Sequence, residues 1–354
     1  MPFLPNRRVV LRGVVGASAL LPVGAFAQHV FLQGTKQAVL DPAICRASFG
    51  EEVVLPQKRV LNFAWNGTSI CTVGVAVAKE KGFFAKRNLA PEFINWGGST
   101  DQLLEAISTA KADAGVGMAL RWLKALESGF DVKIVSGIHG GCMRLLTAAK
   151  SPIHSLNDLK GKTIGTTDNA SPDRNFFSIM LHQAGLDPNN DVEWKVFPGD
   201  ILPVALKKGE VHAFAQGDPL AWSVRERDNL FEIANNLSGE YARRTCCVLG
   251  IRGELVRKER PVAIALAQAL LEAQEWVVSN PDEAAEIFAP YSPKVPVKQL
   301  AAIVRDHTHS NHPTANALRE QITLYADELK QVGVFKKSTD IQKFAARVTS
   351  DLST

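Results

Sequence analysis

Short apolar segments alternate with amphipathic segments from residue 60 to residue 251, and this alternation restricts the fold more than any other feature. The expected strands are Val60–Ala64, Glu92–Asn95, Ala114–Val116, Val132–Ser136, Leu145–Ala148, Thr163–Thr166, Val192–Phe197, Ala213–Gln216 and Cys247–Ile251. The expected helices are Val73–Lys86, Thr100–Thr109, Leu120–Glu127, Asp173–Gln183, Ile201–Lys207 and Ala221–Arg227. Strands that alternate with helices favour parallel α/β sheets over β-sandwiches. From Pro261 the pattern is helical only, so C-terminal helices are expected to cover part of the protein.

The chain of 354 residues is long enough for two domains with separate cores. Nine short strands suit two small sheets better than one, so we expect two lobes flanked by helices. Residues 58–142 and 246–354 are predicted to form a discontinuous first lobe, and residues 143–245 the second lobe. Two strands that cross between the lobes, near Gly140 and near Gly239, would act as a hinge. Ligands of such folds bind in the cleft between the lobes.

The N-terminus has the features of a cleaved export signal over residues 1–27. Arg7 and Arg8 precede an apolar run that ends in Ala25-Phe26-Ala27, a small-x-small cleavage site. The paired arginines favour the twin-arginine route, with an ordinary secretory signal as the alternative. Residues 28–57 have no clear pattern and are expected to form an arm on the surface. The mature protein is therefore predicted to be exported, soluble and periplasmic.

Composition argues against several classes of function. The signal holds three arginines and no acidic residue, so its removal lowers the formal net charge of +4 by three. A nearly neutral mature chain is not expected to bind nucleic acid, and no later segment is expected to span a bilayer. There is no Cys-x-x-Cys or His-x-x-x-His spacing, so no metal site and no cofactor are expected. His307, His309 and His312 lie in a polar segment and are expected at the surface, with a metal site as the alternative.

Four short segments of the sequence resemble those of a known family. They are Ala78-Lys79-Glu80-Lys81-Gly82-Phe83-Phe84 with Leu89, Gly97-Gly98-Ser99-Thr100, Leu156-Asn157-Asp158-Leu159-Lys160-Gly161-Lys162-Thr163-Ile164-Gly165, and Lys208-Gly209-Glu210-Val211-His212-Ala213 with Gly217-Asp218-Pro219. Their order over residues 58–290 resembles that of the solute-binding proteins of ABC importers, in the nitrate/sulfonate/taurine/bicarbonate branch. The resemblance implies a periplasmic-binding-protein type II fold that closes on a small anionic ligand. It also implies delivery of that ligand to an ABC permease in the inner membrane.

The predicted ligand-binding residues fall into two groups. Those of the first lobe are Trp65, Asn66, Thr68, Ser69, Gly98, Ser99, Thr100, Met118, His139 and Gly140, and the others are Arg144, Thr167, Asn169 and Asp218. The turn from Gly98 to Thr100 opens a helix, where backbone amides and hydroxyl groups would face an anion. The alternative is that Ser99 only caps this helix. Trp65 would either lie under an organic ligand or pack in the core.

His139 and Arg144 flank the first crossing between the lobes. His139 and Gly140 match the position of a His-Gly pair in the family's nitrate and bicarbonate binders, which implies contact with an oxyanion. A packed histidine at the seam between lobes is the alternative. Arg144 would form a bidentate clamp on a carboxylate or sulfonate, or an interlobe salt bridge.

Polar residues also follow two strands of the second lobe. Thr167 and Asn169 would supply hydroxyl and amide donors from the wall opposite the first lobe. Asp168 would bind a ligand amine or stabilise its own turn. Asp218 would select against a purely anionic ligand, or it would only open the next helix.

Five cysteines, one of them Cys45, leave the disulfide pattern open. In an oxidising compartment, a disulfide between Cys142 and Cys246 across the two crossings is one interpretation. Cys71 lies near a helix N-terminus, where its pKa should fall, and is a candidate nucleophile. A reactive thiol would depart from the pattern of a plain anion binder.

The predicted function is that of a periplasmic receptor that binds a small oxoanion-bearing solute and does no chemistry. The solute classes considered are sulfonates, carboxylates, nitrate and bicarbonate. The alternative is an enzyme on the same scaffold, either desulfinase-like or forming a pyrimidine precursor. In that case Cys71 or Cys142 would be the nucleophile and His139 its partner. A sensory module that presents the liganded protein to a membrane receptor is a third hypothesis.

Overall fold

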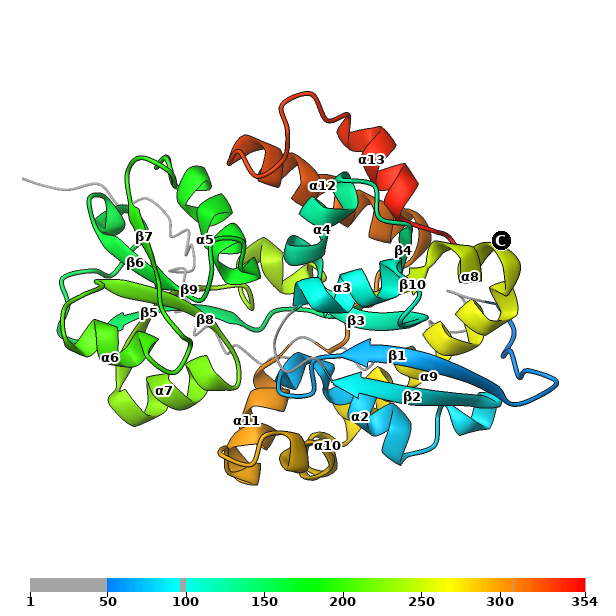
Figure 1. Cartoon of the computed structure of the whole chain (residues 1–354). Coiled ribbons are helices and arrows are strands. Elements are labelled where there is room, and N and C mark those ends of the chain that lie inside the picture. Colours follow the sequence, from blue (N-terminus) through cyan, green and yellow to red (C-terminus); the bar gives the residue numbers. More distant parts are fainter. Residues whose placement is uncertain (1–49, 96–99, 308, 354) are drawn as a thin grey trace, which may run out of the picture. The chain divides into compact units, whose positions relative to one another are not determined.

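The computed structural model describes residues 50–95, 100–307 and 309–353, and the fold is mixed α/β with two five-stranded sheets flanked by helices (Figure 1). The predicted export signal lies outside the described residues, as do Cys45, Gly98 and Ser99. Of the predicted arm, residues 50–57 are described, and only Leu55 among them is buried.

The first sheet has the strand order β2-β1-β3-β10-β4. Its strands are β1 (Arg59–Trp65), β2 (Leu89–Asn95), β3 (Ala114–Met118), β4 (Val132–His139) and β10 (Cys247–Arg252). Strands β2, β1 and β3 pair in parallel, whereas β10 pairs antiparallel with both β3 and β4. The parallel strands end at the same edge of the sheet, so the loops after them meet there.

The second sheet repeats this arrangement in the order β7-β6-β8-β5-β9. Its strands are β5 (Met143–Ala148), β6 (Thr163–Thr166), β7 (Glu193–Val196), β8 (Ala213–Gly217) and β9 (Leu230–Asn235). Here β7, β6 and β8 are parallel, and β5 pairs antiparallel with β8 and β9. Both sheets are therefore mixed rather than purely parallel, because β10 in the first sheet and β5 in the second run against their neighbours.

The chain passes between the sheets twice, from β4 to β5 and from β9 to β10. The two crossings lie side by side, since the amide of Cys246 donates to the His139 carbonyl at 2.7 Å and the amide of Asn236 donates to that of Met143 at 3.2 Å. This is the predicted two-stranded hinge of the periplasmic-binding-protein fold. The exact residue boundaries of the two lobes stay a prediction.

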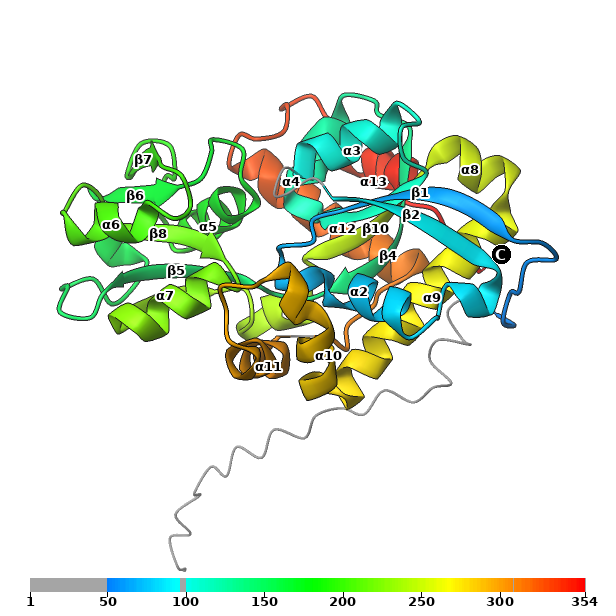
Figure 2. The ribbon, with the colours of Figure 1, turned by 60° about the horizontal axis from the view of Figure 1, so that its bottom comes forward.

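Helices cover both sheets (Figures 1 and 2). The helices in the half of the fold that holds the first sheet (Figure 1) are α2 (Val73–Glu80), α3 (Thr100–Ser108), α4 (Ala119–Glu127), α8 (Gly253–Lys258), α9 (Arg260–Ser279), α10 (Pro281–Phe288), α11 (Val297–Asp306), α12 (Ala315–Gln331) and α13 (Ile341–Val348). Those in the half that holds the second sheet are α5 (Pro172–Gln183), α6 (Leu202–Lys207) and α7 (Leu220–Asp228). Contacts of α5 with α4 and α12 join the two parts. The C-terminal helices were expected from the sequence.

Helix α9 is long and apolar enough to cross a membrane, with 20 residues and a mean hydropathy of 1.2 over its most apolar window. Of that window, 67% is buried inside the fold. Such burial is what a core helix of a globular protein shows. Helix α9 packs against α2 and against β2 and β4 of the first sheet.

Two elements differ from the expectations. The helix expected over Val73–Lys86 ends at Glu80, because Gly82 adopts a left-handed conformation (φ +75°) that an α-helix does not continue through. Strand β9 was missed. It begins directly after α7, where Asn229 at φ +49° ends the helix and leaves no loop to signal a strand.

Candidate functional site

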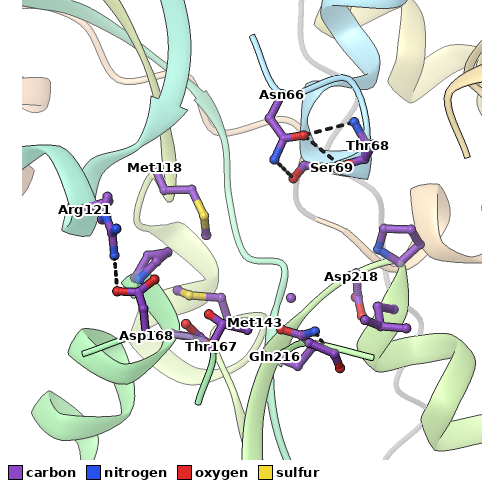
Figure 3. Close-up of a pocket in the computed structure, with 16 residues that line it drawn as sticks. Asn66, Thr68, Ser69, Met118, Arg121, Met143, Thr167, Asp168, Gln216 and Asp218 are labelled. Carbon is purple, nitrogen blue, oxygen red and sulfur yellow. Dashed lines mark hydrogen bonds and ion pairs between the residues drawn. The ribbon is translucent and has the colours of Figure 1, made fainter. Parts of the chain in front are cut away.

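A polar cavity of about 550 Å³ lies between the loops at the ends of strands from both sheets (Figure 3). Its lining residues are Asn66, Thr68, Ser69, Met118, Arg121, Met143, Thr167, Asp168, Pro172, Asp173, Gly199, Gln216, Gly217, Asp218, Pro219 and Leu220. The size suits a small organic molecule. Side chains from both sheets line the cavity, so a solute in it would touch both halves of the fold.

Asn66 organises the wall that belongs to the first sheet. It directly follows β1, and its Oδ1 accepts hydrogen bonds from the Thr68 amide at 3.0 Å and the Thr68 hydroxyl at 2.8 Å. Its Nδ2 donates to the Ser69 hydroxyl oxygen at 2.9 Å. This Asx-type turn positions two hydroxyl groups at the cavity. A Cβ at Gly67 would lie 2.9 Å from the side-chain amide nitrogen of Asn95, so a larger residue there would displace the Asn95 side chain.

An ion pair crosses the cavity from wall to wall. Arg121, on α4 of the first sheet, lies with its Nη1 2.5 Å from Oδ1 of Asp168, in the loop after β6 of the second sheet. Figure 3 shows this contact beside Met118 and Thr167. The sequence reasoning missed Arg121, because an arginine in the first turn of an amphipathic helix has no distinguishing pattern.

Asp173 is an unusual member of the second wall. It lies in the first turn of α5, is only 4% exposed, and its Oδ2 has no hydrogen-bond partner among the described residues. Burial raises the pKa of Asp173 to about 6, despite hydrogen bonds from Ser171 and the backbone that lower it. A buried carboxylate with a free oxygen is suited to accept a hydrogen bond from a ligand N–H group.

Asp218 joins the cavity to a buried ion-pair network. Arg144 Nε donates to both Asp218 oxygens at 3.1 and 3.0 Å, and Arg144 also pairs with Glu232 at 2.7 Å and Asp306 at 2.6 Å. Burial opposes ionisation of Asp218, but the His307 hydrogen bond and the Arg144 charge lower its pKa below the usual value. Arg144 therefore serves the salt bridge that the sequence offered as an alternative. Its predicted role as a clamp on the ligand conflicts with its three carboxylate partners.

The cavity brings together six of the predicted ligand-binding residues. Those that line it are Asn66, Thr68, Ser69, Met118, Thr167 and Asp218. Trp65 is instead a core residue, 2% exposed, with its ring 4.9 Å from that of Tyr291. Asn169 is exposed and binds Arg174, and Gly140 is buried at the crossing. Thr100 begins α3, as expected, but its predicted neighbours Gly98 and Ser99 lie outside the described residues.

His139 does not line the cavity. It is fully buried, and burial together with the neighbouring His309 and His307 lowers its pKa well below the usual value. His307 and His309 are also buried, 6% and 3% exposed, so their expected position at the surface is wrong. The segment after α11 folds inward and places both rings against His139, at centroid distances of 5.1 and 4.8 Å.

The described cysteines are buried close to the same histidine. Cys71, Cys142, Cys246 and Cys247 are all free, so the disulfide considered between Cys142 and Cys246 is not formed. Hydrogen bonds from Cys142 and Cys247 lower the pKa of Cys71. A lowered pKa of Cys71 was expected, but neighbouring thiols cause the decrease rather than a helix N-terminus.

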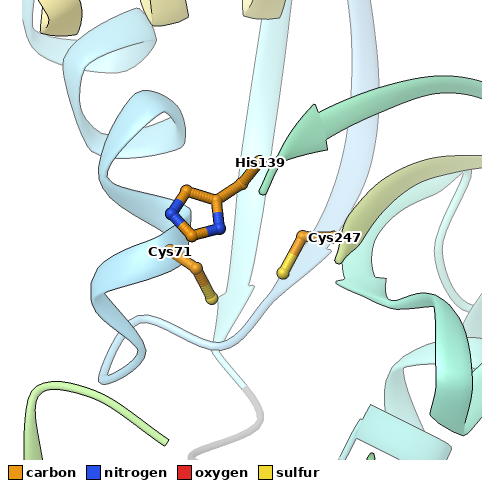
Figure 4. Close-up of side chains that lie close together, drawn as sticks. All are labelled: Cys71, His139 and Cys247. Carbon is orange, nitrogen blue, oxygen red and sulfur yellow. The ribbon is translucent and has the colours of Figure 1, made fainter. Parts of the chain in front are cut away.

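Two groups of side chains share His139 and could each hold a metal ion. One comprises Cys71, His139 and Cys247 (Figure 4), and the other comprises His139, His307 and His309. In each group the candidate ligand atoms lie within 4.8 Å of one another. A metal site that includes His307 and His309 was the alternative to surface histidines. The contributions of His139, Cys71 and Cys247 were not expected, because these residues are far apart in the sequence.

A family model described as NMT1/THI5 like matches residues 71–284 of this chain. Among curated proteins, the chain is 26% identical over 302 residues to a putative thiamine biosynthesis protein of Haemophilus influenzae. That match covers 77% of this chain and 87% of the relative.

Solved structures share the fold. The periplasmic aliphatic sulphonate-binding protein SsuA of Escherichia coli superposes with a TM-score of 0.69 and 18% identity, over 82% of this chain and 92% of SsuA. The periplasmic nitrate-binding protein NrtA of Synechocystis PCC 6803 superposes with a TM-score of 0.66 and 14% identity, over 84% of this chain and 87% of NrtA. These neighbours are binding proteins. The predicted fold class and branch are confirmed.

Proposed function

Because this chain belongs to the NMT1/THI5-like family, whose fold it shares with periplasmic solute-binding proteins, we propose that it is the solute receptor of an ABC importer. It binds a small solute between its two sheets and passes it unchanged to an inner-membrane permease. The observation that carries this proposal is the cavity itself, about 550 Å³ in volume and lined by polar side chains from both halves of the fold.

The charges of the cavity refine the class of solute. Ser69 on one wall and Thr167 on the other offer hydroxyl donors to an oxoanion, whereas the Thr68 hydroxyl already donates to Asn66. The same cavity contains the carboxyl groups of Asp168, Asp173 and Asp218. Asp168 is paired with Arg121 and Asp218 with Arg144. Asp173, with its unpartnered oxygen, is therefore the carboxyl group that a solute with only negative charge would meet at close range, which is unfavourable at low dielectric.

The solute that fits is therefore a small molecule with an oxoanion at one end and an amine or other N–H donor at the other. Aminosulfonates and amino acids have this chemistry, whereas nitrate and bicarbonate lack the N–H group. Asp173, with its unpartnered buried oxygen, is the acceptor for that group. This proposal keeps the oxoanion expected from the sequence and adds a second recognition element.

A thermal-shift comparison of matched compounds tests the proposal. The purified protein is heated with taurine and with ethanesulfonate, and then with an amino acid and the corresponding carboxylate. The amino compounds should raise the melting temperature and their analogues should not, because a bound ligand stabilises the fold by mass action. Equal shifts from both members of each pair would contradict the N–H element.

A matched pair of variants connects binding to the cavity. Asn66→Ala removes the side chain that orders Thr68 and Ser69, so it should abolish the shift. Asn190→Ala, in the exposed turn that follows α5, should leave the thermal shift unchanged. A shift that survives Asn66→Ala would place the solute elsewhere.

The proposal includes no chemical step. Cys71 is 2% exposed and His139 fully buried, and neither lines the cavity, so a solute there does not reach the thiol. Cys71→Ser should accordingly keep the affinity for the solute. A turnover that depends on Cys71 would favour the enzyme instead. We also propose that residues 1–27 are a signal that directs export of the chain and is then removed.

A further inference from the structure

Three histidines meet in the interior of the fold, behind the wall of the cavity. His139 ends β4, and His307 and His309 follow α11. One nitrogen from each ring lies within 4.8 Å of the others, and all three residues are buried. A polar cluster of this kind in a core calls for an explanation, because buried polar groups are normally satisfied.

Several ring nitrogens of this three-histidine cluster lack a partner. Among the described residues, no hydrogen bond reaches His139 Nδ1 or either nitrogen of His309. Each such atom destabilises the fold if it stays unsatisfied, because it has lost its hydrogen bonds to water. Neutral imidazoles are the form that binds metal ions.

The distances suit a tetrahedral ion. His139 Nε2 and His307 Nδ1 are 3.2 Å apart. Two nitrogens at this separation, each about 2.0–2.1 Å from a zinc ion, subtend an angle of about 100°, close to the tetrahedral value. The pair is thus already spaced as two ligands of one ion, and a nitrogen of His309 lies within 4.8 Å of both.

Asp218 supplies the outer contact typical of histidine metal ligands. Its Oδ2 lies 2.8 Å from His307 Nε2. When Nε2 carries the proton and donates it to this carboxylate, the lone pair of Nδ1 faces the cluster. A carboxylate behind a ligating histidine fixes the tautomer and the ring orientation, which prepares the site for an ion.

We propose that His139, His307 and His309 bind one divalent transition-metal ion, with zinc as the ion whose coordination fits best. The ion would tie the end of β4 to the segment after α11 and, through Asp218, to the wall of the cavity. This site is independent of the proposed solute receptor function, since a solute is not needed to complete it.

A competing arrangement uses thiols. Cys71 and Cys247 share His139 with the three-histidine cluster and could bind the same ion through sulfur. The three-histidine set is favoured by the unpartnered nitrogens of His309 and by the Asp218 contact. Cobalt distinguishes the two sets, because thiolate ligands give an intense charge-transfer band in the near ultraviolet and imidazole ligands do not.

The first experiment is a zinc titration of the chelator-treated full chain by calorimetry, with the melting temperature recorded in parallel. One zinc per chain and a rise in melting temperature are expected. His309→Gln should weaken zinc binding by about 100-fold or more. The matched control is His182→Gln, an exposed histidine on α5 that should leave the affinity unchanged. Absence of stoichiometric zinc binding by the wild-type chain would overturn the proposal.

The second experiment needs no variant of a buried histidine, so it holds even if His309→Gln does not fold. Cobalt is added to the chelator-treated wild-type chain and to Cys71→Ser. Visible d–d bands without a thiolate band, unchanged in Cys71→Ser, are expected. A thiolate band that disappears in Cys71→Ser would move the ion to the Cys71, His139 and Cys247 group and overturn the three-histidine assignment.

Discussion

The guanidinium group of Arg121 lies 2.5 Å from the carboxylate of Asp168, and this ion pair joins the two walls of the cavity. Arg121 belongs to α4 of the first sheet, and Asp168 follows β6 of the second. The Arg121 side chain is 12% exposed and that of Asp168 is 45% exposed. A contact of this kind favours the conformation in which the walls are close, as the proposed binding of a solute between them requires.

Asp168→Asn should weaken solute binding by roughly fivefold or less, because a half-exposed ion pair contributes at most about 1 kcal/mol. The loss should shrink at high ionic strength, where the wild-type pair is screened. Calorimetry at two salt concentrations measures both effects. Asp131→Asn breaks the exposed pair with Arg257 and serves as the control. Identical affinities of Asp168→Asn and wild type at both salt concentrations would contradict the role in closure.

Arg144→Met should destabilise the fold by about 3 kcal/mol or more, since it leaves Asp218 buried beside other carboxylates without their shared cation. Arg144 itself is only 2% exposed. Urea unfolding gives the difference in the free energy of unfolding. The matched control is Arg227→Met, which removes an exposed ion pair with Asp228. Equal stability of the two variants would show that the network is not important for the fold.

Asp173 should make the fold less stable as the pH rises. Its pKa is about 6 in the folded protein against 3.8 for an ordinary Asp, so the folded state binds the proton more tightly. The contribution to stability is therefore highest below pH 4, falls between about pH 4 and pH 6, and stays low above. The difference in pKa corresponds to about 3 kcal/mol at pH 7.

Asp173→Asn tests this dependence. The variant should be more stable than wild type at pH 7, by up to about 3 kcal/mol, and nearly equal to it at pH 4. Urea unfolding of both proteins at the two pH values gives the comparison, with pH 4 as the internal control. A variant that is less stable than wild type at pH 7 would contradict the charging cost assigned to Asp173.

The buried cysteines should contribute no disulfide to stability. Cys71, Cys142, Cys246 and Cys247 are free, so a reducing agent should leave the melting temperature unchanged in a Cys45→Ser background. Thiol titration of the unfolded variant should then find every cysteine reactive without prior reduction. A melting temperature that falls on reduction would reveal a bond between these residues.

Much of the fold could be predicted from local patterns. The strands follow from short apolar segments; the strand expected at Thr163–Thr166, for example, has the same bounds as β6. The strand order of each sheet, in contrast, depends on pairing between distant segments. Asn66, Ser69 and Thr167 were found because they follow strands, and in open α/β sheets that edge binds ligands. Strand β9 was missed because only Asn229 separates it from α7.

The rest of the site depends on contacts between distant segments. Nothing near Arg144 in the sequence shows that Glu232 and Asp306 neutralise it. The polar segment that holds His307 and His309 resembles a surface linker, yet it packs against His139, 168 residues earlier than His307. Local polarity indicates exposure only on average, and tertiary packing overrides it where buried polar groups find one another.

The most direct test of the account is a crystal structure of the protein with the solute that gives the largest thermal shift. Density for the solute is predicted in the cavity, with contacts to Ser69 on the first wall and to Thr167 and Asp173 on the second. A solute bound outside this cavity, or bound to one wall with the other remote, would contradict the account.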